Sequence, residues 1–159
     1  MSSAASLFAV SQPFSPLSPD KREAVVNSVR ERLLTPMGLR TLDPSDLGYK
    51  PQYKNSMVER DAAYHNGTVW PWLIGPYCEA VLRNAKFSPA SKDEVRRALK
   101  PLIGELTTRH GMPGPIWQLA EVYDGEPVKG ERNPDGCPAQ AWSVAEVLRV
   151  LGLIDSTPA

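Results

Sequence analysis

The sequence has few of the residues that mark metal sites and disulfide frameworks. It contains only two histidines, His65 and His110, and two cysteines, Cys78 and Cys137, in 159 residues. Neither histidine stands in a spacing typical of metal ligands, so we expect no metal site. Two cysteines do not make a disulfide framework, and we expect both to be free, buried thiols of a cytoplasmic protein.

An excess of charge of one sign and long apolar runs are missing as well. The 18 basic and 18 acidic residues cancel, and no basic stripe is present, which argues against nucleic acid as a partner. No apolar stretch reaches the roughly 20 residues that a membrane span needs. Residues 1–10 have no basic region of the kind that begins a signal peptide. We therefore expect no nucleic acid and no membrane among the partners of this chain.

Proline, in contrast, is abundant, with 16 residues. Apolar periodicity resumes after each proline cluster, so the prolines mark helix starts and ordered loops rather than disorder. We expect helices at about 7–14, 18–34, 69–85, 91–110 and 138–151. Within them, Ser91 is expected to cap the fourth helix, Pro101 to kink it, and Gly152 to cap the last.

The loops between these helices alternate between long and short. Residues 36–68 and 111–136 form long connections with little periodicity, and nowhere does apolar and polar alternation persist long enough to predict a strand. We therefore expect an all-α fold of stacked helical hairpins with long loops at one end. It would form a single domain, 1–159, with a flexible tail at 153–159.

Two tracts and one loop carry most of the functional information. The tracts are YHNGTVWPWLIGPY at 64–77 and GCPAQAWSVAE at 136–146, and each runs from a turn into a helix. Between them lies AEVYDGEP at 120–127, a loop rich in carboxylates and aromatic residues. Sugar C–H faces stack on indole rings, and carboxylates bind hydroxyl groups or act on the glycosidic bond. Tryptophans and carboxylates together at helix ends therefore indicate a sugar site.

These motifs resemble the C-terminal part of the glycogen debranching enzyme family, its amylo-alpha-1,6-glucosidase domain. The resemblance runs from about Leu7 to about Leu151 and covers less than half of the family's catalytic domain. It implies part of an (α/α)6 barrel, as in six-hairpin glycosidases, and hydrolysis of α-1,6-linked glucose branches with inversion. It also implies an α-glucan substrate, such as glycogen, and a mechanism that uses no metal or organic cofactor.

The resemblance places the general base at Glu121, in the Ala-Glu-Val-Tyr-Asp-Gly loop. The alternative is that Glu121 is one of several solvated loop acids. In the family the general acid is an aspartate upstream of the matched stretch. Asp61 lies in the right kind of loop, but it matches the segment before Tyr-His-Asn-Gly. Because a proton relay needs both groups, we expect the chain alone not to hydrolyse α-1,6-linked glucosides.

The motifs and the family resemblance together give six candidate substrate-binding residues, which are His65, Asn66, Trp70, Trp117, Asp124 and Gln140. For Asn66 the alternative is a tight turn with Gly67 that caps the next helix. Trp70 and Trp72, two apart at a helix start, are expected to point to different faces. We expect the segments 61–68, 115–126 and 136–142 to converge, with Glu121 facing a cleft between His65 or Trp70 and Trp117 or Gln140.

Three interpretations of the chain stay open at this point. It could be a split or truncated glucosidase that needs a second chain to supply the rest of the barrel. It could be a non-catalytic helical module that binds glucan or another protein, or a fragment with no separate function. Because a partial barrel leaves apolar helix flanks bare, we expect a dimer or larger species. The contact would partly involve either Val95, Leu99 and Leu106 or the faces of the neighbouring helices.

Overall fold

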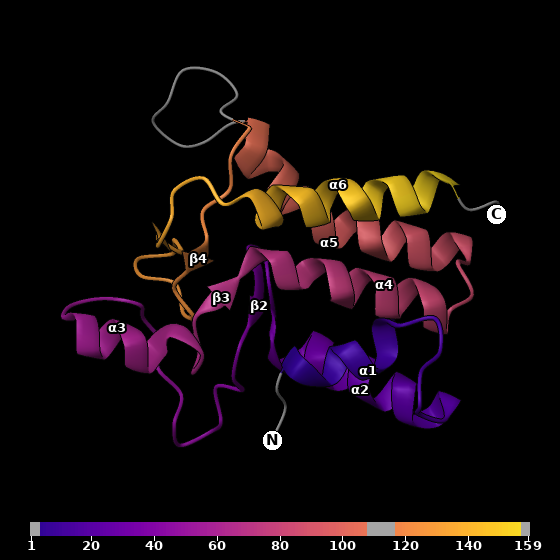
Figure 1. The fold of residues 1–159 in the computed structure, drawn as a ribbon, viewed down its shortest axis with the longest axis horizontal. Coiled ribbons are helices and arrows are strands. Elements are labelled where there is room, and N and C mark those ends of the chain that lie inside the picture. Colours follow the sequence, from indigo (N-terminus) through magenta and orange to yellow (C-terminus); the bar gives the residue numbers. More distant parts are fainter. Residues whose placement is uncertain (1–3, 108–116, 157–159) are drawn as a thin grey trace.

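The computed structural model describes residues 4–107 and 117–156, and helices dominate it (Figure 1). Its α-helices are α1 (Phe8–Ser11), α2 (Pro19–Arg32), α3 (Met57–Tyr64), α4 (Ile74–Asn84), α5 (Pro89–Thr107) and α6 (Ala141–Ser156). Two short 3-10 helices, η1 (Ala4–Leu7) and η2 (Pro71–Leu73), precede α1 and α4. Within the described residues, no helix combines the length and apolar character needed to cross a membrane.

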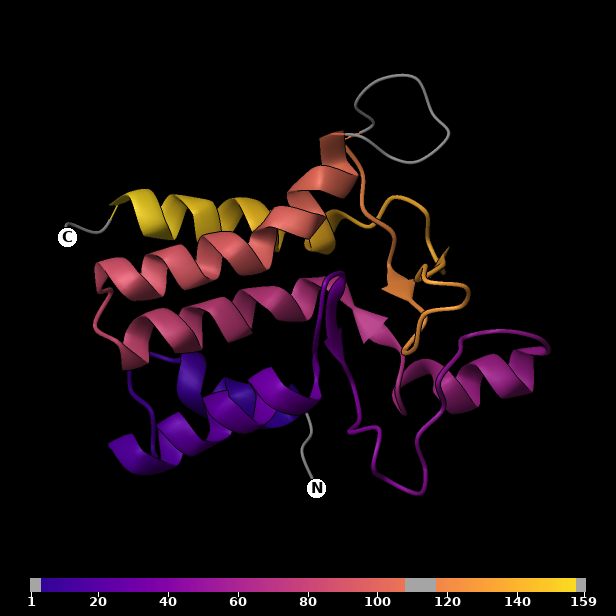
Figure 2. The same cartoon turned by 180° about the vertical axis from the view of Figure 1, so that it is seen from behind.

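Helix α4 is the centre of the molecule. It packs against α1 and α2 on one side and against α5 and α6 on the other, so the helices form layers (Figures 1 and 2). This arrangement explains why most of α4 is buried, including Tyr77 and Cys78. The layers agree with the expected helical packing, and membership of an (α/α)6 barrel stays a prediction.

The apolar side chains of α5 belong to this core. Val95 and Leu99 are fully buried, and Leu106 is nearly so. The expectation that these three residues take part in a contact between copies is therefore wrong, because the helix turns its apolar stripe inward against α4 and α6. The alternative contact through neighbouring helices stays a prediction. Pro101 lies inside α5, as expected, and Figure 2 shows the helix bending in its second half.

A small antiparallel sheet corrects the all-α expectation. Its strands are β1 (Leu34–Thr35), β2 (Gly38–Arg40), β3 (Val69–Trp70), β4 (Val122–Tyr123) and β5 (Pro134–Asp135), in the order β1-β2-β3-β4-β5. Each strand has two or three residues, which is too short for a period-two pattern to appear in the sequence. The sheet joins segments that are far apart in sequence, since β3 pairs with both β2 and β4.

Several helix boundaries differ from the expected ones. Helix α3 was not expected, although a capping box at its start, between Ser56 and Glu59, stabilises it. Helix α5 begins at Pro89, where the Ser88 carbonyl and hydroxyl accept from the first turn, so Ser91 is not the cap. Gly152 lies inside α6, which runs to Ser156 and therefore continues into the expected flexible tail. The expected close of α5 at His110 lies outside the described residues.

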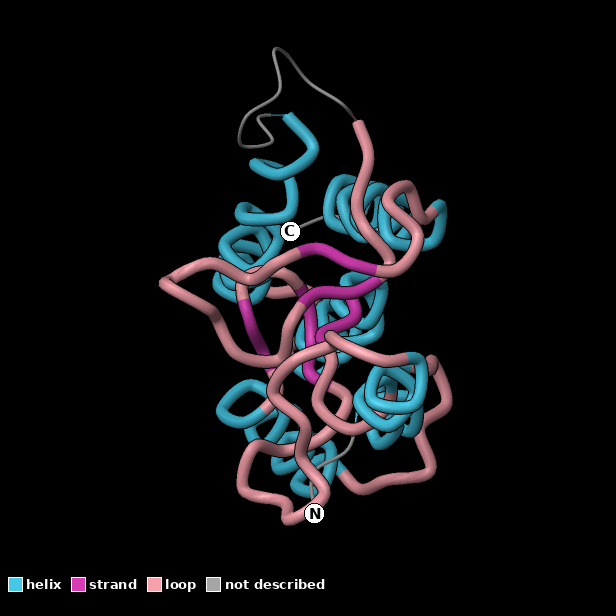
Figure 3. Tube along the Cα trace, turned by 90° about the vertical axis from the view of Figure 1, so that its left-hand side faces the viewer, coloured by secondary structure: helices cyan, strands magenta, loops and turns pink. Residues whose placement is uncertain are grey.

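The long connections gather at one end of the helices. In the view of Figure 3 this end faces the reader, with the strands crossing in front of the helices and the loops around them. The short connections, such as that between α4 and α5, lie at the opposite end (Figure 1). The expected separation of long and short loops is thus present in the described part of the chain, and the sheet holds the long loops together.

Candidate functional site

Two hydrogen-bond donors hold the Glu121 carboxylate at this loop-bearing end. The Tyr64 hydroxyl group donates to Oε1 at 2.7 Å, and the Cys137 backbone N–H donates to Oε2 at 3.0 Å. Glu121 is half-buried. A carboxylate has about four lone-pair positions, so these two bonds leave room for a water molecule or a sugar hydroxyl group.

The position of Glu121 follows from the register of the sheet. Val122 in β4 lies opposite Asp135 in β5, and one step further the Glu121 N–H donates to the Cys137 carbonyl at 2.8 Å. Glu121 therefore stands across from Gly136, whose φ is +69°. A Cβ atom at Gly136 would lie 2.5 Å from Glu121 Oε2, so only glycine permits this approach.

Tyr64, at the end of α3, is surrounded by aromatic rings. Its ring centroid lies 4.6 Å from that of Trp70, 4.8 Å from that of His65 and 5.6 Å from that of Tyr53. The Trp70 indole N–H donates to the Tyr64 carbonyl at 2.9 Å. Burial, followed by the hydrogen bond to Glu121, raises the pKa of Tyr64 to about 12. The hydroxyl group therefore stays protonated and remains a donor near neutral pH.

Beside Tyr64 the surface has a hollow lined by aromatic rings, which we call the aromatic hollow. It measures about 360 Å³, and its lining residues are Ala4, Ala5, Phe8, Thr41, His65, Trp70, Trp72, Leu73 and Trp142. The His65 ring stacks on Trp70 with an interplanar angle of 10°. Rings set around an open space in this way can receive the apolar face of a sugar.

The two neighbouring tryptophans do not point to different faces as expected. Trp70 and Trp72 each lie 6.1 Å from Trp142 between ring centroids, and all three line the aromatic hollow. The expectation assumed a regular helix, in which residues two apart diverge. Trp70 instead belongs to β3 and Trp72 to η2, so helical spacing does not apply to the pair.

Trp117 and Gln140 line a second, more open hollow of about 390 Å³. Trp117 is 65% exposed, and the Gln140 N–H donates to the Leu119 carbonyl, which joins the start of α6 to the chain just before Glu121. The structure thus brings Glu121 close to His65 and Trp70 through Tyr64, while Trp117 and Gln140 lie around a separate hollow. The described parts of the three segments, 61–68, 117–126 and 136–142, lie at one end of the helices, while residues 115 and 116 lie outside the described residues. The expected single cleft between the two sets of residues is replaced by two hollows, and a sugar contact for each residue stays a prediction.

Asn66 and Asp124 are used by the protein itself. The Asn66 side chain donates to the Ala62 carbonyl, and its own carbonyl accepts from Lys50, which supports the turn interpretation. The buried Asp124 carboxylate accepts from the Tyr53 N–H and the Asn133 amide and pairs with Lys54. Asp124 therefore holds the loop that follows Glu121, which differs from the sugar contact expected for it.

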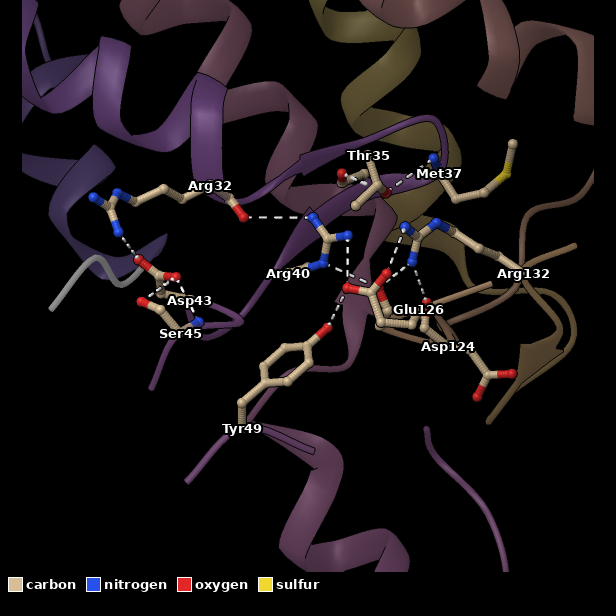
Figure 4. Close-up of polar contacts among 12 residues, drawn as sticks. Arg32, Thr35, Met37, Arg40, Asp43, Ser45, Tyr49, Asp124, Glu126 and Arg132 are labelled. Atoms are coloured by element: carbon tan, nitrogen blue, oxygen red, sulfur yellow. Dashed lines mark hydrogen bonds and ion pairs between the residues drawn. The ribbon is translucent and has the colours of Figure 1, made fainter. Parts of the chain in front are cut away.

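A polar network fixes the other side of this loop (Figure 4). Arg40 donates to the Gly125 carbonyl at 3.0 Å and to Glu126 at 2.9 Å, and Tyr49 donates to the same Glu126 oxygen. Arg132 donates to the carbonyls of Asp124 and Gly125. The loop that carries Glu121 is thereby attached to β2 and to the connection before α3.

A similar cluster near β2 holds the start of that connection. The buried Asp43 accepts from the Ser45 backbone and pairs with Arg32 at 2.8 Å. The Ser45 N–H, followed by Arg32, lowers the pKa of Asp43 to about 2. This carboxylate therefore stays ionised in the folded protein except in strong acid.

The sequence pointed to Glu121 but not to the groups that hold it. Tyr64 opens the first tract, so its place beside His65 was a usable signal. Gly136 and Cys137 open the second tract, but only the pairing of β4 with β5 shows that they face Glu121. Cys137 is exposed and Cys78 is buried, so the expectation of two buried thiols is wrong for Cys137.

Other carboxylates lie near this site. Asp61 and Asp135 act electrostatically on Tyr53, as Glu121 does, while burial is the largest of the causes that raise the pKa of Tyr53. Both aspartates are exposed. Among residues 4–107 and 117–156, no three histidine, cysteine, aspartate or glutamate side chains gather as a metal site would require.

Comparisons with known proteins show one family and, among the similar relatives, a yeast enzyme. The family model described as amylo-alpha-1,6-glucosidase matches residues 4–149. The chain is 29% identical over 154 residues to the glycogen debranching enzyme of Saccharomyces cerevisiae. That match covers 89% of this chain and 10% of the yeast protein, so the chain spans about a tenth of the relative's length.

Proposed function

The chain belongs to the amylo-alpha-1,6-glucosidase family, and we propose that it contributes the general base to the hydrolysis of α-1,6-linked glucose branches. The base is Glu121, and the substrate is a branched α-glucan of the glycogen type. The observation that carries this proposal is the Glu121 carboxylate, held by Tyr64 and Cys137 next to the aromatic hollow.

The reaction requires one water molecule and two carboxyl groups. Glu121 takes a proton from water as the water oxygen bonds to C1 of the terminal glucose. The C1–O bond to the branch oxygen breaks, and a second carboxyl group, the general acid, gives that oxygen a proton. Attack from the face opposite the leaving group releases β-glucose. No group of the chain is oxidised or reduced.

The general acid is proposed to lie outside the 159 residues, as the family resemblance implies. In inverting glycosidases the two carboxyl groups stand roughly 6.5–9.5 Å apart. Asp61 and Asp135 are the alternatives within the chain, because both act on Tyr53 beside Glu121. The 159 residues alone are therefore expected to release no glucose from an α-1,6-linked glucoside.

A substrate that needs no general acid tests the role of Glu121 as the base separately from the location of the acid. Fluoride leaves α-glucosyl fluoride without a proton, so its hydrolysis depends on the base alone. We expect the purified chain to release fluoride, and Glu121→Gln to lower kcat/KM by about 100- to 10,000-fold. Glu131→Gln, which alters another exposed acid of the same loop region, is the matched control and is expected to leave the rate unchanged. Equal fluoride release by wild type and Glu121→Gln would remove Glu121 from the mechanism.

The aromatic hollow favours a second candidate, a non-catalytic module that binds glucan. In that case a linear maltooligosaccharide would bind to the chain, and Trp142→Ala would weaken this binding in isothermal titration calorimetry. Glucan binding without any fluoride release from α-glucosyl fluoride would favour the binding module over the enzyme part.

A further inference from the structure

Tyr64 stands between the aromatic hollow and the Glu121 carboxylate. On one side its ring contacts His65 and Trp70, both of which line the hollow. On the other side its hydroxyl group donates to Glu121 Oε1 at 2.7 Å. One side chain thus connects the rings on which a sugar would stack with the carboxylate that would activate water.

The position of Tyr64 is itself well determined. Its carbonyl accepts from the Trp70 indole N–H at 2.9 Å, and its ring packs between Trp70 and Tyr53. The second donor to Glu121 is the backbone N–H of Cys137, which β5 places through its pairing with β4. Two donors from different elements, one on each oxygen, restrict the rotation of the carboxylate.

We infer that Tyr64 is a positioning residue, which holds the Glu121 carboxylate in the orientation that receives a proton from the attacking water. This role rests on the proposed function of Glu121 as the general base. The hydroxyl group occupies one lone pair of Oε1, and the second lone pair can accept from a further donor such as water. Misplacing a reacting group by about 1 Å can lower the rate about 100-fold. A donor that restricts the carboxylate keeps such a displacement small.

The ionisable groups around Tyr64 come from three segments. Glu121 precedes β4, Tyr53 lies before α3, and His65 follows it. Arg60, Asp61 and Asp135 act on Tyr53 rather than directly on Tyr64. Of these groups only Glu121 accepts a hydrogen bond from the Tyr64 hydroxyl group. Deleting the hydroxyl group therefore changes the surroundings of Glu121 with little effect on the other charges.

Tyr64→Phe keeps the ring contacts and removes this one donor. With α-glucosyl fluoride, we expect kcat to fall about 10- to 100-fold with little change in KM. Tyr53→Phe removes a neighbouring phenol that does not bond to Glu121, and it is expected to keep both kcat and KM. A Tyr64→Phe variant with the wild-type kcat, or one in which KM rises while kcat is kept, would overturn the inference.

A second measurement does not depend on activity. In the wild-type chain with ¹³Cζ-labelled tyrosine, we expect the Tyr64 signal to stay at the phenol position at pH 11, since burial and the bond to Glu121 raise its pKa to about 12. In Glu121→Gln it should move part of the way to the phenolate position. The same Tyr64 titration in both proteins would show that the contact is absent in solution and would overturn the inference.

The two experiments separate this inference from the proposed function. Loss of fluoride release in Glu121→Gln together with unaltered kinetics in Tyr64→Phe would refute the positioning role alone. If the wild-type chain releases no fluoride, the base role has failed, and the tyrosine titration still decides whether Tyr64 fixes the carboxylate.

Discussion

Gly136→Ala is the substitution that most sharply tests the geometry around Glu121. The new Cβ atom would lie 2.5 Å from Glu121 Oε2, whereas ordinary contact begins at 3.4 Å, so the carboxylate must retreat by about 0.9 Å. This movement would break the bond from the Cys137 N–H, which as a bond to a charged group is worth about 1.5–3 kcal/mol. Alanine at a φ of +69° adds about 1–2 kcal/mol of backbone strain.

Gly130→Ala is the matched control. Gly130 also has a positive φ, +88°, but nothing lies within 4 Å of the Cβ atom that alanine would add. It is expected to lower the free energy of unfolding by the strain alone, about 1–2 kcal/mol. Gly136→Ala should lose about 2.5–5 kcal/mol in urea unfolding, the sum of strain and the lost bond. It should also lose about 100-fold in the hydrolysis of α-glucosyl fluoride, which Gly130→Ala should retain.

The comparison of Gly136→Ala with Gly130→Ala also has an outcome that would contradict the geometry around Glu121. Equal losses of stability and of fluoride release in the two variants would mean that Glu121 does not approach residue 136 in solution. The register of β4 and β5 would then be wrong at this point, and with it the position of the proposed base.

Three further predictions concern the scaffold. Leu99→Ala should lower the free energy of unfolding by about 2–5 kcal/mol because Leu99 is fully buried, whereas Leu148→Ala, at an exposed position of α6, should stay within about 0.5 kcal/mol in the same urea titration. The hydrogen bond from the Ser45 N–H is the main reason that the pKa of Asp43 is about 2 rather than its ordinary 3.8. Asp43 therefore adds stability above pH 4, and this stability is lost as the pH falls toward 2. Asp43→Asn should flatten this part of the curve of unfolding free energy against pH. Glu126→Gln should cost about 1–3 kcal/mol and loosen the loop after Glu121, seen as faster amide hydrogen exchange there, because two arginines lose the carboxylate that they share.

The sequence predicted the long helices well because their signals are local. Helix α2 begins after Ser18 with Pro19 in its first turn, and α5 carries the expected apolar spacing through Leu106. Helix α3 was missed even though Ser56 and Glu59 form a capping box, because its eight residues offer little apolar periodicity and only Ala63 is buried.

The sheet and the surroundings of Glu121 depend on contacts that no local pattern contains. Strands of two or three residues leave no alternation to detect, so the pairing that brings Gly136 opposite Glu121 appears only in the fold. Glu121 itself was selected through the family resemblance, because several acids of its loop look alike in sequence. Asp124 was selected in the same way, and the fold adds that its carboxylate is buried and bonded within the protein.

The most direct test of the central claim is rescue of Glu121→Ala by azide. Removing the side chain removes the base and opens space beside C1, and azide can attack there without giving up a proton. With α-glucosyl fluoride, we expect Glu121→Ala to be inactive in buffer and to form β-glucosyl azide when azide is added, as measured by ¹H NMR of the product. Formation of α-glucosyl azide, or fluoride release by Glu121→Ala at the wild-type rate without azide, would contradict the assignment of Glu121 as the base of an inverting reaction.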